Sequence, residues 1–74
     1  MSTLAEMNRG DCAIVSKLAS TGSIRRRLQD IGLIPGTKVE CVQISPLGDP
    51  AAYLFRGTVI ALRSEDSSTI ILQE

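Results

Sequence analysis

Short stretches of apolar residues recur along this chain and are separated by clusters of turn-forming residues. Their length and their partial alternation with polar residues predict five strands, over residues 12–18, 38–44, 51–55, 58–62 and 69–72. In the first stretch, Cys12, Ile14 and Leu18 are expected to share one face of the strand. Ala13 and Val15 are expected on the opposite face. Five short strands joined by turns are typical of a small closed barrel, which leaves no sheet edge open.

One helix is predicted between the first two strands, over residues 24–31. Its apolar residues recur at i, i+4 and i+7 and so form one stripe, made of Ile24, Leu28 and Ile31. Gly32 follows at the position where helices commonly end in a left-handed residue. Pro35 and Gly36 then suit the centre of a type II turn, because proline fixes the first φ and glycine accepts a positive second φ. The chain is therefore expected to reverse direction soon after the helix.

Two further segments favour a single helical turn each. Thr3 and Glu6 have the spacing of a capping box, which favours a turn over residues 4–7. The polar stretch 63–68 favours another turn immediately before the last strand.

The composition fits one small domain over residues 1–74. A chain of this length buries only about 60% of its unfolded surface, so the core must be small. Apolar residues make up 43% of the chain and are nearly all aliphatic, which suits a tightly filled barrel. Eight basic residues balance eight acidic ones. This balance disfavours a protein whose main partner is the phosphate backbone of a nucleic acid or a charged membrane surface.

The N-terminal residues also bear on localisation. They lack the basic segment and apolar core of a signal peptide, and no apolar run approaches the length of a membrane-spanning helix. The two cysteines are fewer than a disulfide-stapled secreted domain of this size usually carries. We therefore expect a cytoplasmic protein with reduced thiols that does not insert into a membrane.

The residue inventory offers little for catalysis or metal binding. The chain has no histidine, which removes the Ser/His/Asp and Cys/His catalytic sets and a preferred ligand of ferrous iron. Cys12 and Cys41 lie on different predicted strands, outside the spacing of a zinc site, and are expected to pack as small apolar side chains. Four carboxylates in predicted turns are expected to be solvated: Asp11, Asp49, Glu65 and Asp66. We predict no enzymatic activity, no metal site and no cofactor.

The loop 46–50 is a candidate for partner binding. Pro46 and Pro50 bracket it and would hold Leu47 and Asp49 exposed in a stiff segment, which lowers the cost of ordering on binding. The alternative is a loop shaped only to join two strands.

Residues of the helix and its exit are further candidates. Arg25 and Arg26 are expected to face solvent, either as partner contacts or as an ordinary solvated helix face, while Arg27 lies nearest the barrel. Leu33 and Ile34 are expected to form an apolar lip beside the loop described above, in the manner of barrels that hold short peptides. Such a lip would also allow weak self-association.

Several motifs occur in the order found in one family of small bacterial proteins. They are Gly10, Arg27-Leu28, Ile31-Gly32-Leu33-Ile34-Pro35-Gly36, Pro46-Leu47-Gly48-Asp49-Pro50 and Gly57-x-x-Ile60-Ala61-Leu62-Arg63. In these motifs the chain resembles the FeoA family over nearly its whole length. The resemblance implies a mostly β fold, a small five-stranded barrel like that of Src homology 3 (SH3) domains, with one short helix between strands 1 and 2. It also implies the fold of the C-terminal domain of iron regulators of the diphtheria-toxin-repressor type.

The resemblance further implies a function in ferrous iron uptake. The protein would be a non-enzymatic accessory that docks on the cytoplasmic part of a FeoB-type transporter. One alternative is a small-barrel nucleic-acid-binding protein, which the lack of a basic face and of stacking aromatic residues disfavours. Another is a stand-alone metal-sensing domain. The family is often described as related to transition metals, but this chain has no histidine to serve as a ligand.

Overall fold

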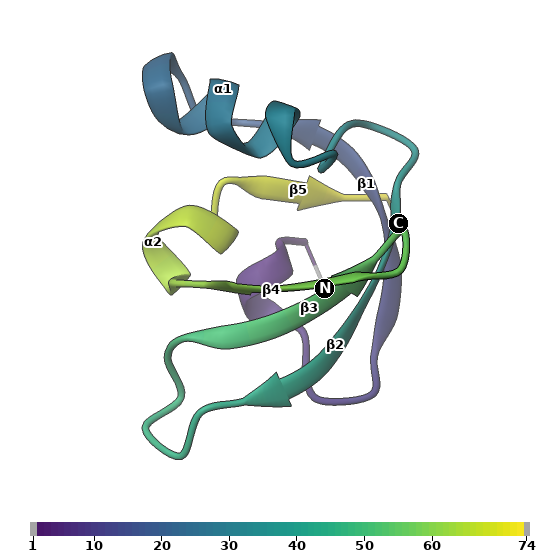
Figure 1. Cartoon of the computed structure of the whole chain (residues 1–74), viewed down its shortest axis with the longest axis vertical. Helices are drawn as coiled ribbons and strands as arrows, with labels where there is room; N and C mark the ends of the chain where they lie inside the picture. Colours follow the sequence, from purple (N-terminus) through teal and green to yellow (C-terminus); the bar gives the residue numbers. More distant parts are fainter. Residues whose placement is uncertain (1, 74) are drawn as a thin grey trace.

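The computed structural model describes residues 2–73 as a strongly curved antiparallel sheet with short helical segments (Figure 1). The strands are β1 (Cys12–Leu18), β2 (Lys38–Ile44), β3 (Ala51–Phe55), β4 (Thr58–Leu62) and β5 (Ile70–Leu72). The helical segments are the 3₁₀ turn η1 (Leu4–Glu6), α1 (Gly22–Asp30) and α2 (Ser64–Ser67). These bounds confirm the five predicted strands, the helix between the first two and both short turns. The helix α1 begins two residues earlier than predicted, because its N-cap is Thr21.

The strand β1 is shared between two neighbours. Residues 12–14 pair with β2, whereas residues 15–18 pair with β5, and the register shifts between Val15 and Lys17. This bulge adds one residue and so changes which side chains point inward. Val15 and Leu18 are buried, whereas Cys12 and Ile14 are exposed. The prediction that Leu18 shares a face with Cys12 and Ile14 is therefore wrong.

The two edge strands of the sheet differ in whether another segment of the chain pairs with them. The strand order is β4-β3-β2-β1-β5, which places β4 and β5 at the ends. The N-terminal segment covers the outer edge of β5 through a bridge between Thr3 and Ile71 and a 2.9 Å hydrogen bond from the Leu72 N–H to the Ser2 carbonyl. No strand among residues 2–73 covers the outer edge of β4. The prediction of a barrel closed by strand pairing is therefore wrong, because β4 and β5 do not pair with each other.

The core is aliphatic apart from the sulfur-containing Met7 and Cys41 and the aromatic Tyr53 and Phe55, all of which are almost fully buried. The Tyr53 hydroxyl donates a 3.3 Å hydrogen bond to the Leu4 carbonyl and so ties η1 to the barrel. In η1 itself, the Thr3 N–H donates to the Glu6 carboxylate at 3.1 Å, as the predicted capping box requires. Together these hydrogen bonds hold the N-terminal segment over the core.

The exit from α1 is fixed by backbone geometry. Gly32 has a φ of +101° and Gly36 a φ of +91°, values that glycine adopts without strain. The N–H of Leu33 donates to the Leu28 carbonyl at 3.0 Å and returns the Leu33 side chain to the core. The chain therefore reverses from α1 into β2 as predicted.

Candidate functional site

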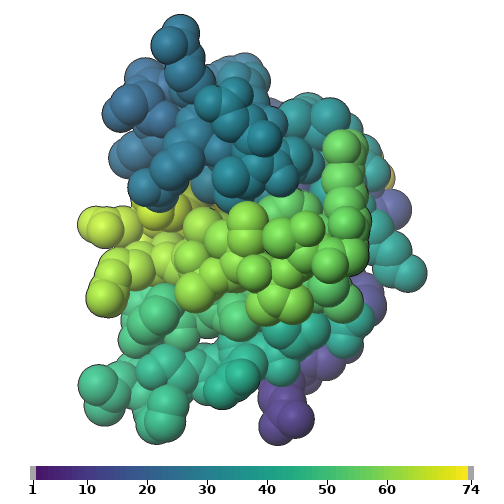
Figure 2. Space-filling model, viewed as in Figure 1, coloured from purple at the N-terminus to yellow at the C-terminus, as the bar shows by residue number. Residues whose placement is uncertain are grey.

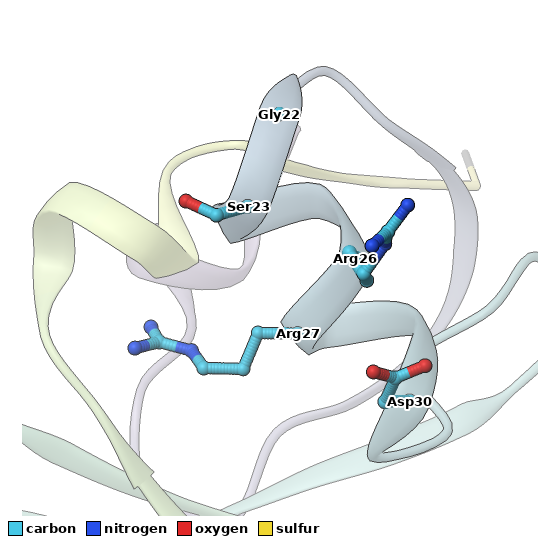
Figure 3. A pocket seen from close by; sticks show the side chains of 5 residues that line it. All are labelled: Gly22, Ser23, Arg26, Arg27 and Asp30. Atoms are coloured by element: carbon cyan, nitrogen blue, oxygen red, sulfur yellow. The ribbon is translucent and has the colours of Figure 1, made fainter.

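One ion pair joins α1 to α2. The Arg27 Nη2 donates to the Asp66 Oδ2 at 2.6 Å, and Figure 3 shows the Arg27 side chain extending from α1 toward α2. This placement agrees with the expectation that Arg27 lies nearest the barrel. It is the only ion pair within residues 2–73. Asp66 is therefore a structural partner and not the solvated turn residue that was predicted.

The other two arginines of α1 are exposed. Arg26 lines a shallow hollow on the surface of α1 with Ser23 and Asp30, and Figure 3 shows its guanidinium pointing away from Arg27. Arg25 also faces solvent. Both guanidinium groups are therefore accessible to a partner, as charged groups on any solvated helix face are.

The loop between β2 and β3 projects from the end of the molecule opposite α1 (Figure 2). Leu47 at its tip is 94% exposed, and Pro46 is also exposed. Hydrogen bonds hold the loop at its base, from the Gly48 N–H to the Ser45 carbonyl at 2.7 Å and from the Ser45 N–H to the Pro50 carbonyl at 3.1 Å. The loop thus presents a large apolar side chain from a fixed backbone.

Asp49 does not serve this loop as an exposed contact. Its Oδ1 accepts a 2.9 Å hydrogen bond from the Ser64 N–H, and its Oδ2 accepts one of 3.3 Å from the Ser64 hydroxyl. The carboxylate thus satisfies an N–H at the start of α2 that has no partner within the helix. The expectation that Asp49 projects into solvent is corrected.

Leu33 and Ile34 do not form the predicted lip. Leu33 is fully buried, so it belongs to the core, whereas Ile34 is 37% exposed. Ile34 precedes β2 and the 46–50 loop follows it, so the length of that strand, roughly 20 Å, separates them. Figure 1 shows the two segments at opposite ends of β2. The sequence pattern could not show this, because a buried and an exposed aliphatic residue look alike after a helix end.

The cysteines and the remaining turn carboxylates give a mixed result. Cys41 is buried as predicted, and burial raises the pKa of its thiol. Cys12 is exposed, so the prediction that it packs as an apolar side chain is wrong. The cause is the bulge in β1, which also overturned the predicted face of that strand. Asp11 accepts a 2.8 Å hydrogen bond from the Asn8 N–H and closes a turn, whereas Glu65 is solvated as predicted.

Sequence reasoning missed an apolar strip on the outer face of the β3–β4 hairpin. The register places Leu54 opposite Val59 and Ala52 opposite Ala61. Val59 is 58% exposed and Ala61 is exposed, whereas Leu54 and Ala52 are half-buried. The signal in the sequence was that β4 has apolar residues at its outward positions as well as at its inward ones.

Within residues 2–73 no group of three or more Cys, Asp or Glu side chains is arranged to hold a metal ion. No helix in that part of the chain has the length and apolar character needed to cross a membrane.

Known proteins share this architecture. The family model of the FeoA domain matches residues 2–74. Among solved structures, iron(II) transport protein A of Clostridium thermocellum superposes with a TM-score of 0.91 at 30% identity, over 96% of this chain and 44% of that one. FeoA of Stenotrophomonas maltophilia, a prokaryotic SH3 domain protein solved in complex with zinc, superposes with a TM-score of 0.86 at 27% identity, over 96% of this chain and 88% of that one. The expected SH3-like fold is confirmed.

A manganese-dependent transcriptional repressor also has this fold, with a TM-score of 0.84 at 14% identity over 95% of this chain and 39% of that one. This confirms the expected likeness to a repressor domain, at the level of fold alone.

A curated relative places such a domain within a longer protein. The Fe(2+) transport protein A/Fe(2+) transporter FeoB fusion protein of Porphyromonas gingivalis is 33% identical over 67 residues, which are 90% of this chain and 8% of the fusion protein. Together with the family match over residues 2–74, this shows that the chain belongs to the FeoA domain family.

Proposed function

We propose that this protein is a non-enzymatic accessory of ferrous iron uptake that acts in the cytoplasm by docking on a FeoB-type transporter. The observation that carries the proposal is the fusion protein of Porphyromonas gingivalis, in which a homologous region shares one chain with FeoB. Two domains joined in one chain act at a high local concentration of each other. We infer that the separate domain binds the same kind of transporter.

The exposed groups described above supply contacts for such docking. Leu47 and Pro46 stand on a loop whose base is hydrogen-bonded, so little conformational entropy is lost when a partner covers them. Arg25 and Arg26 on α1 and the half-exposed Ile34 offer further contacts of different chemistry. Arg25 and Arg26 lie at the opposite end of the molecule from Leu47 and Pro46 (Figure 2), so a single partner need not touch all of these groups.

The proposal is tested by affinity capture of the tagged protein from native membranes, read by mass spectrometry. Recovery of a FeoB-type transporter is the expected result, and Leu47→Ser is expected to reduce it. Ile14→Ser is the matched control, because Ile14 is also an exposed aliphatic residue, 40% accessible, but lies outside the proposed contacts. Capture of RNA-bound proteins in place of any transporter, across several detergents and iron levels, would refute the docking role.

A further inference from the structure

The outer face of the sheet at β1 and β2 is not covered by any helical segment of residues 2–73. Figure 1 shows α1, α2 and η1 on the other side of these strands. The register places Cys12 opposite Glu40 and Ile14 opposite Lys38. Paired residues of an antiparallel ladder share a face, and Val39 between the two pairs is fully buried. The four paired side chains therefore point outward.

The part of this face that β1 contributes is apolar. Ile14 is 40% exposed, and Cys12 on the same strand is exposed as well. Both line a shallow hollow together with Lys38 and Gln73. Removal of this apolar surface from water would stabilise any complex in which a second surface covers the hollow.

The strand β2 adds two opposite charges to the same face. Lys38 is exposed and Glu40 is half-buried, and neither has an ion-pair partner among the residues that the structure describes. They are two residues apart on one strand, so their Cα atoms are separated by about 6.6 Å. A face with one positive and one negative group side by side is complementary to a rotated copy of itself.

One twofold arrangement of two copies satisfies both the charges and the apolar groups. An axis that passes over Val39 at right angles to β2 brings the two faces together with their β2 strands antiparallel. This rotation places Lys38 of each copy opposite Glu40 of the other, and Ile14 of each copy over Cys12 of the other, at the hollow. Packed sheets lie about 10 Å apart, a gap that a lysine and a glutamate side chain span together.

We propose that the outer face of β1 and β2 binds a second copy of the chain, with Lys38 and Glu40 forming reciprocal ion pairs across the twofold axis. A face-to-face arrangement with parallel β2 strands would instead place each of these residues over its own copy, and like charges disfavour it.

The size of the face limits the strength of this dimer. Even with four residues from each of the strands β1 to β4, it has a flat area of about 250 Å², below the roughly 800 Å² that each partner buries in a stable complex. We therefore expect a weak dimer, with a dissociation constant between about 10 µM and 1 mM. The dimer leaves the proposed docking groups free, because Leu47 and Arg26 lie away from this face, and its formation does not require the transporter (Figure 2).

The test measures self-association of the intact protein by sedimentation velocity over a concentration range up to about 1 mM. Lys38→Glu leaves only acidic groups at the ion pairs, and Glu40→Lys leaves only basic ones. Each variant alone is therefore expected to weaken the dimer at least about tenfold. An equimolar mixture of the two variants restores opposite charges in both ion pairs, so it is expected to associate at least as tightly as the native protein.

Further variants separate this contact from a general effect of charge. The double variant Lys38→Glu/Glu40→Lys exchanges the two charges and is expected to associate within about threefold of the native protein. Lys17→Glu and Glu65→Lys are the matched controls, because they change the net charge equally at exposed positions, in the part of β1 that pairs with β5 and in α2. Both controls should leave self-association unchanged. If a single variant fails to fold, the double variant against the controls still decides the outcome.

Three results would overturn the proposal. They are a native protein that stays monomeric at about 1 mM, single variants that associate like the native protein, and a mixture that associates no more tightly than its separate components. The contact is located by NMR on dilution, where the amide shifts are expected at residues 12–14 and 38–40. Shifts confined to other residues would equally refute this face as the contact.

The dimer and the proposed function fail independently. Ile14→Ser is expected to weaken the dimer and to leave capture of the transporter unchanged. Capture of the transporter by a protein that stays monomeric would refute the dimer alone. A dimer without capture of any transporter would support this face and refute the proposed function alone.

Discussion

At the scale of single residues, two neighbours in the sequence can differ completely in burial. Leu33 and Ile34 follow each other after α1, yet Leu33 is fully buried and Ile34 is 37% exposed. The hydrogen bond from the Leu33 N–H to the Leu28 carbonyl causes this difference, because it fixes the direction in which the chain leaves the helix.

Replacement of these two residues should therefore have unequal effects. Leu33→Ala removes a fully buried side chain and is expected to lower the free energy of unfolding by about 2 to 5 kcal/mol. Ile34→Ala at the surface should cost less than about 1 kcal/mol. Urea unfolding measures both values. A loss from Ile34→Ala as large as that from Leu33→Ala would contradict the assignment of Leu33 to the core.

Two buried, weakly acidic groups, the Cys41 thiol and the Tyr53 hydroxyl, should make the protein less stable at alkaline pH. Burial raises the pKa of the Cys41 thiol and of the Tyr53 hydroxyl above their ordinary values of 9.0 and 10.0. The unfolded chain therefore loses these protons at a lower pH than the folded chain does. The free energy of unfolding is expected to fall as the pH rises above about 9, which is measured by urea unfolding across that range. Cys41→Ala should show a weaker fall, and an unchanged pH profile in that variant would contradict the argument for Cys41.

At the scale of elements, much of the fold could be predicted because local signals agree. Apolar stretches gave the strands, and glycine and proline gave the turns, including the reversal after α1. The face assignment of β1 failed, because a bulge between Val15 and Lys17 leaves no local mark in the sequence. The roles of Asp49 and Asp66 were equally hidden, since Ser64 and Arg27, the residues they bind, lie far from them in sequence.

The candidate site could likewise be predicted only where exposure follows from the local sequence. The exposure of Leu47, Arg25 and Arg26 could be predicted from the turn chemistry and the helix period. The position of β4 at the end of the sheet could not be predicted, because it depends on the order of strands.

The bond between Asp49 and Ser64 couples the 46–50 loop to α2, and its loss should be measurable. Asp49→Ala leaves the Ser64 N–H without its acceptor and is expected to lower the free energy of unfolding by about 1 kcal/mol. Glu65→Ala is the matched control, because Glu65 is a solvated carboxylate of the same short helix. Urea unfolding of both variants gives the comparison. Equal losses would show that the carboxylate of Asp49 has no special role.

At the scale of the whole molecule, a small barrel presents exposed groups on several sides. The core is filled by side chains, and the features that remain exposed are a loop tip, a helix face and the outer face of the β3–β4 hairpin. These suit the proposed role, recognition by another protein, which is supported by the fusion of a homologous region to FeoB in the relative from Porphyromonas gingivalis.

The most direct test of this role is a calorimetric titration of the purified protein with the purified cytoplasmic domain of the FeoB-type transporter from the same organism. We expect saturable binding that Leu47→Ser weakens and that Ile14→Ser leaves unchanged. An absence of binding at the highest attainable concentrations, with both proteins shown to be folded, would refute the docking role.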